Sequence, residues 1–179
     1  MGKKKSKIAI LGLDNVGKTS LIRNLFNKQS KFSIPPRTHG IEVTEVVLEK
    51  NNERIPLMFI DVGGLKVFQV TLWDGLLSSD IKAIIYMVDM HSTERIDSDL
   101  HAFSIVANNT KVPLLVLGNK YDIGEEDNTP GPSNRLFEIL DIVEHQINNP
   151  FREIIVLPIS VKTGLNMDVI TDCLYKFLK

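Results

Sequence analysis

Short apolar runs alternate with segments of helical period along most of the chain. Four of these runs are rich in Ile, Val and Leu and almost continuously apolar, as strands buried on both faces should be. They are Lys7–Leu11, Ala83–Val88, Val112–Leu117 and Glu153–Leu157. Each run is followed by a segment whose apolar residues recur every three or four positions, which predicts an amphipathic helix. The repeated alternation of strand and helix predicts a mostly parallel sheet with helices on both sides.

Two further strands are predicted at Ile41–Glu49 and Ile55–Ile60, on either side of the polar segment Lys50–Arg54. This pattern is typical of a hairpin, and it would give the sheet one antiparallel edge strand. We therefore expect an α/β fold with a six-stranded, mostly parallel sheet and about five helices.

Composition and charge narrow the class of protein. A chain of 179 residues can bury a single large core, and its one cysteine, Cys173, excludes a disulfide framework. No apolar run reaches the roughly 20 residues needed to span a bilayer. These features favour a cytoplasmic protein, which we expect to be a monomer without nucleic-acid partners.

The basic residues are unevenly distributed. The first seven residues contain no acidic side chain, and four of the 21 basic residues lie there, which leaves 17 against 22 acidic residues in 8–179. The four are Lys3, Lys4, Lys5 and Lys7. We expect a flexible basic tip over residues 1–6, followed by one acidic domain over residues 7–179.

The strongest motif lies between the first predicted strand and the first predicted helix. Gly12–Thr19 has the sequence GLDNVGKT and fits G-x-x-x-x-G-K-[ST]. Glycines at both ends let the backbone wrap a phosphate chain with its N–H groups pointing inward, Lys18 can reach the β- and γ-phosphates, and the Thr19 hydroxyl can bind Mg²⁺. The predicted nucleotide-binding residues of this loop are Asp14, Asn15, Val16, Gly17, Lys18, Thr19 and Ser20.

Two later segments indicate which base is bound. Asn119, Lys120 and Asp122 follow a predicted strand, and a carboxylate at Asp122 can accept from both N1–H and the 2-amino group of guanine. Adenine offers neither donor, so Asp122 would be left desolvated and unpaired against ATP. Ser160, Val161 and Lys162 follow the last strand and can supply N–H groups to the guanine carbonyl, although such a tripeptide is also common in ordinary loops.

Three more residues are candidates for the metal and the γ-phosphate. Asp61 closes a predicted strand and can hold Mg²⁺ through water, and Gly64 can bring its N–H against a γ-phosphate because no side chain intervenes. Thr38 lies in the loop before the hairpin, where its hydroxyl could complete the Mg²⁺ shell.

Together these motifs resemble the Arf/Arl/Sar type of small GTPase, over residues 7–178. The resemblance rests on Gly12–Thr19, Thr38–Gly40, Asp61–Gly64, Leu72-Trp73, Asn119–Asp122 and Ser160–Lys162. It implies a Rossmann-like P-loop G domain that binds GTP and GDP with Mg²⁺ and hydrolyses GTP to GDP and phosphate. It also implies a molecular switch in membrane trafficking or membrane-associated signalling. Exchange factors, activating factors and effectors would act at two switch regions, which contain Thr38 and Gly64.

One departure from the family concerns catalysis. The family has Gln directly after the double glycine, where this chain has Leu65. That Gln orients the attacking water, and Leu has no donor or acceptor with which to do so. With Lys18 and Thr38 as the remaining catalytic candidates, we expect slow hydrolysis and a favoured GTP-bound state. Either the substitution was introduced to trap that state, or this lineage dispensed with the Gln.

A second departure concerns the N-terminus, since only Met1–Ser6 precede the first predicted strand and the amphipathic helix usual in Arf proteins does not fit there. Residues 1–6 match the M-G-x-x-x-[ST] pattern for myristoylation of Gly2. An acyl chain and a few lysines would together make a two-signal anchor for an anionic membrane. The alternative is a solvated tip without a binding role.

Two classes of function remain open. The first is a regulatory GTPase whose output is its conformational state. The alternative is a G-domain binding module or scaffold that stays loaded with GTP and never turns over, similar to the β subunit of the signal-recognition-particle receptor. A P-loop kinase or ATPase is disfavoured by Asp122.

Overall fold

A computed structural model describes residues 4–26, 40–63, 80–92, 96–122, 132–145 and 153–179. Six strands form one sheet in the order β2-β3-β1-β4-β5-β6. The strands are β1 (Ser6–Leu11), β2 (Ile41–Lys50), β3 (Glu53–Val62), β4 (Ile81–Asp89), β5 (Leu114–Asn119) and β6 (Ile154–Pro158). Only β2 and β3 pair antiparallel, and β2 is an edge strand. The predicted six-stranded, mostly parallel sheet with one antiparallel edge is confirmed.

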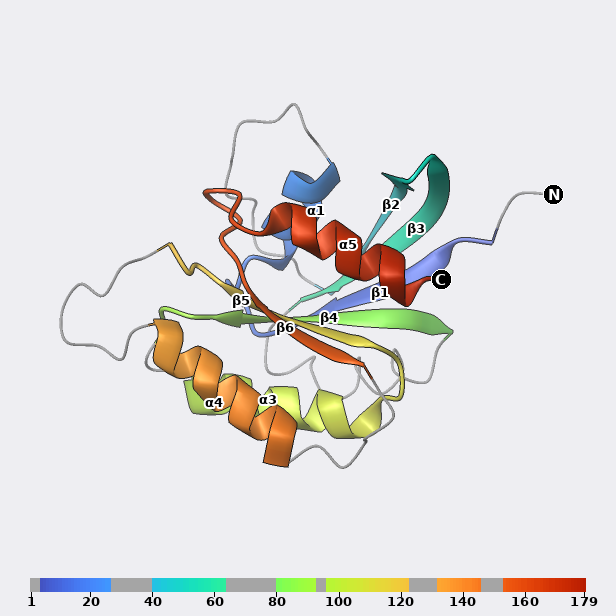
Figure 1. Cartoon of the computed structure of the whole chain (residues 1–179). Helices are drawn as coiled ribbons and strands as arrows, with labels where there is room; N and C mark the ends of the chain where they lie inside the picture. The colour runs from blue at the N-terminus through green and yellow to red at the C-terminus, as the bar shows by residue number, and fades with distance from the viewer. Residues whose placement is uncertain (1–3, 27–39, 64–79, 93–95, 123–131, 146–152) are drawn as a thin grey trace.

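Four helices lie in the described part of the chain, and they cover both faces of the sheet (Figure 1). They are α1 (Lys18–Phe26), α3 (Ile96–Asn109), α4 (Pro132–His145) and α5 (Met167–Phe177). Helices α1 and α5 lie on one face, and α3 and α4 lie on the other. A fifth helix has no counterpart within the described ranges. None of the helices there combines the length and the apolar character needed to cross a membrane.

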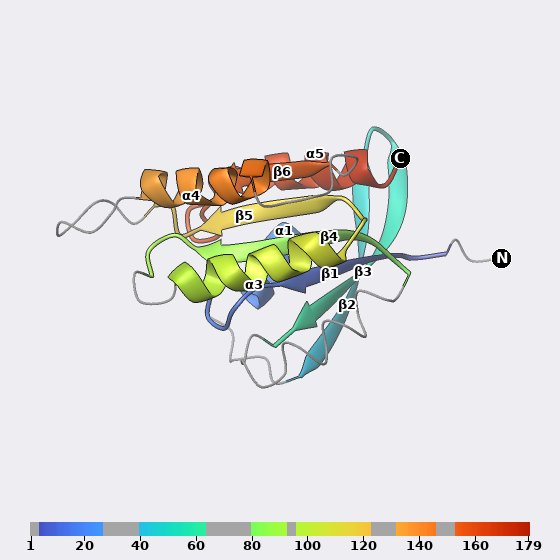
Figure 2. The ribbon, with the colours of Figure 1, turned by 90° about the horizontal axis from the view of Figure 1, so that it is seen from below.

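Successive residues of the central strands serve opposite faces of the sheet, so one strand supplies two hydrophobic cores. In β1, Ile8 and Ile10 pack toward α1 and α5, while Ala9 and Leu11 pack toward α3 and α4. All four are fully buried. Figure 2 shows the molecule from below, with α3 in front of the sheet, and in the strand order β2 and β6 form the two opposite edges. The apolar run of β1 is therefore required by burial on both sides.

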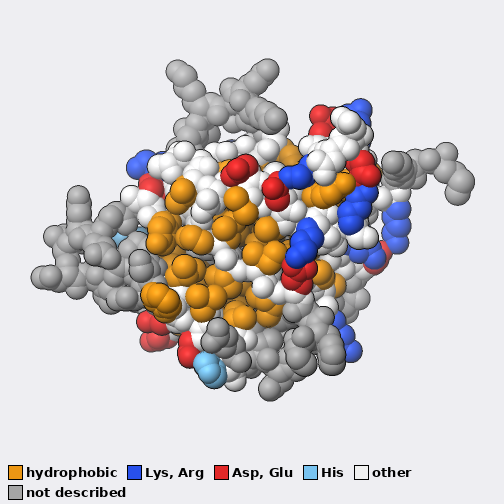
Figure 3. Space-filling model, in the orientation of Figure 1, with side chains coloured by type: hydrophobic (Ala, Val, Ile, Leu, Met, Phe, Trp, Pro, Cys, Tyr) orange, Lys and Arg blue, Asp and Glu red, His pale blue; other side chains and the backbone are white. Residues whose placement is uncertain are grey.

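The second sheet edge is formed by β6, which lies between α4 and α5. All five residues of this strand are half-buried. Hydrophobic side chains gather on the face of the molecule that is turned toward the viewer in Figure 1, as the space-filling view shows (Figure 3). Pro158 occupies the last position of the strand, where the absence of an N–H limits pairing with another strand.

Most strand boundaries differ by one or two residues from the sequence-based expectation, and two of these differences have a clear physical reason. The strand predicted at Val112–Leu117 runs instead from Leu114 to Asn119. Pro113 cannot donate to a strand ladder, whereas Gly118 and Asn119 pair with the last residues of β4. The predicted hairpin turn Lys50–Arg54 is reduced to two residues, because Lys50 and Glu53 already pair. As a result, Asn119 is the end of a strand and is held by the sheet.

Candidate functional site

The candidate site lies at the carboxyl ends of the parallel strands, where ligands of open α/β sheets bind. The loop after β1 contains residues 12–17 and leads directly into α1. Gly12 and Gly17 have φ angles of 135° and 103°, which L side chains rarely adopt. A Cβ atom on Gly12 would lie 2.3 Å from the Met87 carbonyl oxygen, and one on Gly17 would lie 2.5 Å from Asn119 Nδ2. Both positions therefore require glycine for the turn and for close approach.

Lys18 is the first residue of α1 and only 6% exposed. Its Nζ donates to the carbonyl oxygens of Gly12, at 3.1 Å, and Leu13, at 2.7 Å. The ammonium group is thus held against the loop that the sequence assigns to phosphate, at the positive end of α1. Of the other predicted loop residues, Val16 is buried, Asp14, Thr19 and Ser20 are half-buried, and Asn15 is exposed with a φ of 62°.

Thr19 and Asp61 meet beside this loop. Thr19 Oγ1 donates to Asp61 Oδ2 at 2.5 Å, and Asp61, in β3, is fully buried. A hydroxyl and a carboxylate that converge in this way supply the hard oxygen donors that Mg²⁺ prefers, so the residues present fit this ion. Within the described ranges, no three His, Cys, Asp or Glu side chains form a metal-binding group. A cation here would therefore depend on phosphate oxygens and water for its other ligands.

Asn119 connects three loops that are far apart in the sequence. Its Nδ2 donates to the Val16 carbonyl oxygen at 2.8 Å, and its Oδ1 accepts from the Val161 N–H at 3.1 Å. Asn119 is 4% exposed, so these bonds form in a desolvated environment. The phosphate-type loop, the loop after β5 and the loop after β6 are consequently locked into one arrangement.

The loop after β6 is itself well ordered by hydrogen bonds. Ser160 is fully buried, its Oγ accepts from the Thr163 N–H at 3.0 Å, and the Val161 carbonyl accepts from Asn24 Nδ2 of α1 at 2.9 Å. Lys162 and Asp122 are exposed. The structure thus brings together the predicted residues of the first loop, Asp61, Asn119–Asp122 and Ser160–Lys162. The predicted residues Thr38, Gly64, Leu65 and Gly2 lie outside the described residues.

Sequence reasoning missed one residue of this region, Asp89 at the end of β4. Its Oδ2 accepts from Lys120 Nζ at 2.7 Å, and its Oδ1 accepts from the His91 N–H at 3.0 Å. The available signal was an acidic residue at the end of a predicted strand next to the one that leads to Asn119. The pairing of Asp89 with Asn119 in the sheet brings the carboxylate to Lys120, and this register is not apparent from the sequence.

Comparison with known proteins assigns the family. The sequence model of the ADP-ribosylation factor family, Arf, matches residues 1–176. The chain therefore belongs to the Arf family of small GTPases, as a divergent member.

Individual relatives are moderately similar. The chain is 36% identical to ADP-ribosylation factor-related protein 1 of Rattus norvegicus over 125 residues, 65% of this chain and 59% of the relative. It is 31% identical to ADP-ribosylation factor-like protein 9 of Homo sapiens over 121 residues, 67% of this chain and 61% of the relative. The match thus spans about three fifths of these two relatives. ADP-ribosylation factor-like protein 8d of Arabidopsis thaliana is 30% identical over 179 residues, which cover 98% of this chain and 93% of that protein.

A solved structure shares the fold. The Arl6 BBS3 small GTPase from Trypanosoma brucei, with the bound nucleotide analogue GppNp, matches with a TM-score of 0.72. The match covers 97% of this chain and 96% of that one at 21% sequence identity. At this identity the likeness concerns the fold, which is that of a small GTPase G domain.

Proposed function

We propose that this chain is a guanine-nucleotide switch that binds GTP and GDP together with Mg²⁺ and hydrolyses GTP slowly. The observation that carries the proposal is the double hydrogen bond of Asn119, which joins the phosphate-type loop to both loops proposed to contact the base. A single ligand with a phosphate chain at one end and a base at the other fits this arrangement. Membership of the Arf family supports the same conclusion.

Different residues of the site would bind different parts of the nucleotide. Lys18 is held by two backbone carbonyls at the loop, so its ammonium can meet the β- and γ-phosphates with little rearrangement. Thr19 and Asp61, with Thr38, would hold Mg²⁺, which neutralises phosphate charge when bound. Asp122 would accept from N1–H and the 2-amino group of guanine, while Ser160, Val161 and Lys162 would contact its carbonyl side and ring.

The slow hydrolysis rests on Leu65 and the absence of a polar group there to orient water. Leu65→Gln is therefore expected to raise the single-turnover rate of GTP hydrolysis, on the order of tenfold to a hundredfold, because it supplies that positioning contact. Leu65→Ala is the matched control: it changes size without adding a donor or acceptor, and its rate should stay at that of the unsubstituted chain.

Nucleotide release should be measured on all three proteins, so that a change in rate is not confused with loss of ligand. A Gln variant that binds GTP but turns over no faster would contradict the proposal of a switch disabled at one position. It would instead support the second candidate, a binding module that stays loaded with GTP. Leu65 also favours this candidate, because it cannot orient the attacking water.

The proposed function also includes protein partners and contact with a membrane. We propose that exchange factors, activating factors and effectors act at the segments around Thr38 and Gly64, in membrane trafficking or membrane-associated signalling from the cytoplasm. The lysines of the tip, with acylation at Gly2, would provide contact with an anionic membrane. Lys4 and Lys5 form ion pairs with Asp80 and Glu45, so part of their charge is already balanced within the protein.

A further inference from the structure

Asp89 lies between the end of β4 and the loop that carries Asp122. It is 8% exposed, and among its contacts one carboxylate oxygen accepts from Lys120 Nζ at 2.7 Å and the other from the His91 N–H at 3.0 Å. The side chains of Lys120 and Asp89 are 29% and 11% exposed, so water screens this ion pair only partly. Both oxygens of the carboxylate are thus used to hold the ends of two neighbouring strands.

Lys120 has an unusual backbone conformation, with a φ of 67°. Non-glycine residues seldom adopt this left-handed conformation, and they keep it only where the surroundings impose it. Here it turns the chain out of β5, two residues before Asp122. The side chain of the same residue is the one that Asp89 binds, so the ion pair fixes the residue at which the chain turns.

Backbone hydrogen bonds restrain the neighbours of Lys120 on either side. The Met90 N–H donates to the Asn119 carbonyl at 2.9 Å, and the Tyr121 N–H donates to the Ile159 carbonyl at 3.1 Å. These bonds hold the residues before and after Lys120 to β4 and to the end of β6. Asp89 supplies the side-chain contact that holds the turn itself, and Asp122, which is exposed, depends on the turn for its direction.

We propose that Asp89 is a positioning residue for base recognition. By binding Lys120, it orients the Asp122 carboxylate and thereby sets the preference for a base with a 2-amino group. The inference rests on the proposed function, because it assumes that Asp122 contacts guanine. In this proposal Asp89 acts through Lys120 and does not contact the base. Its effect is on the hydrogen bond that Asp122 would accept from the 2-amino group of guanine, because both oxygens of Asp122 must be oriented correctly for this bond to form beside the one from N1–H.

The test compares GDP with IDP, which lacks the 2-amino group. Asp89→Asn preserves the size of the side chain but leaves one acceptor oxygen and no charge. It should speed GDP release about five- to tenfold, because a charge-assisted hydrogen bond is lost, and should change IDP release less than about twofold. The ratio of the GDP release rate to the IDP release rate, measured with fluorescent nucleotides in a stopped-flow instrument, should therefore rise. Asp89→Glu keeps the charge and should give an intermediate ratio.

Asp80→Asn is the matched control. Asp80 directly precedes the same strand at its other end and also pairs with lysine, so the same substitution there removes a more exposed carboxylate–lysine pair away from the site. It should alter neither release rate. Equal acceleration of GDP and IDP by Asp89→Asn, or an unchanged ratio, would overturn the positioning role and leave the proposed function intact. Failure of the unsubstituted chain to bind guanine nucleotides would overturn both.

Discussion

Asn119 illustrates what the fold adds at the scale of single residues. Its motif assigns it to base recognition, yet both polar atoms of its side chain bond to protein, at Val16 and Val161. An amide can donate and accept at once, which an aspartate or a leucine of similar size cannot do. Asn119 therefore organises the site, and in the proposed function the exposed carboxylate of Asp122 would distinguish one base from another.

Asp122→Asn is accordingly expected to shift preference from guanine to xanthine nucleotides. The amide can donate to the 2-carbonyl of xanthine, while its contact with the 2-amino group of guanine is weakened. The loss for GTP should be at least tenfold, or about 1.4 kcal/mol, because the guanine N–H donors lose a charged acceptor. Competition titration of GTP against XTP provides the measurement. An unchanged GTP affinity would refute the role of Asp122 in base recognition.

Residues of the site differ in how far the sequence alone could identify them. Gly12, Gly17, Lys18 and Thr19 form a contiguous motif whose spacing carries its own physical explanation. Asp89 belongs to no contiguous motif, because its partner Lys120 is 31 residues away and comes near only through the pairing of β4 with β5. Contacts that depend on sheet register are the part of the site that could not be predicted.

At the scale of elements, the β2–β3 hairpin shows how local chemistry sets a boundary. Asn51 and Asn52 form the two-residue turn, with φ angles of 52° and 62°. Tight hairpin turns of this kind require two consecutive positive φ angles, and Asn tolerates them better than other side chains do. The polar composition of Lys50–Arg54 predicted the turn but not its length. The length of two residues follows from the cross-strand pairing of Lys50 with Glu53.

Asn52→Ala should therefore destabilise the protein. Alanine pays the full cost of the left-handed conformation, about 1 kcal/mol or somewhat more in the free energy of unfolding. Asn52→Gly, the matched control, adopts this conformation without strain and should keep the stability of the unsubstituted chain. Urea denaturation followed by circular dichroism measures both. Equal stabilities of the Ala and Gly variants would show that the turn does not carry this strain.

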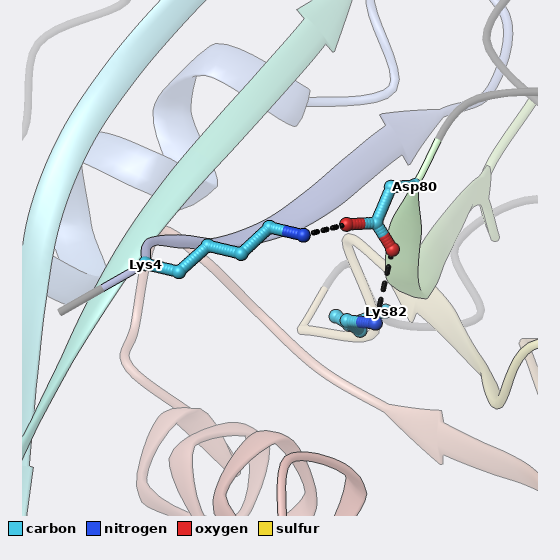
Figure 4. A network of polar contacts seen from close by, with 3 residues as sticks. All are labelled: Lys4, Asp80 and Lys82. Carbon is cyan, nitrogen blue, oxygen red and sulfur yellow. Dashed lines mark hydrogen bonds and ion pairs between the residues drawn. The ribbon is translucent and has the colours of Figure 1, made fainter.

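At the scale of the whole molecule, the described part of the basic tip, which begins at Lys4, lies at the opposite end of β1 from the phosphate-type loop. Lys4 and Lys82 both donate to Asp80 there, at 2.7 and 3.0 Å (Figure 4). The hydrogen bond from Lys4, followed by that from Lys82, lowers the pKa of Asp80 from 3.8 to about 2. Because the folded-state pKa is the lower one, the pair stabilises the fold above pH 3.8, and this contribution is lost as the pH falls toward 2. Lys4, the first described residue of the tip, is therefore ion-paired to the domain at neutral pH.

The overall fold was largely predictable because burial on both faces imposes a continuous apolar pattern on strands such as β1 and β4. Strand number, strand direction and the antiparallel edge all follow from that pattern and from the connecting segments. The near-balance of charge in the whole sequence conceals two unequal parts, a tip rich in lysine and an acidic domain with its site at the far end of the sheet. Which surface meets a membrane or a partner is not encoded in these regular patterns.

The central claim is that this domain holds a guanine nucleotide with a slow step at hydrolysis. The most direct test is to denature the freshly purified protein and identify the released nucleotide by ion-exchange chromatography. We expect about one guanine nucleotide per chain, because Asn119 joins the three loops of the proposed site. GTP should be in excess over GDP if Leu65 slows turnover as proposed. Adenine nucleotide at the same occupancy, or a chain that neither retains nor takes up GTP, would contradict the account.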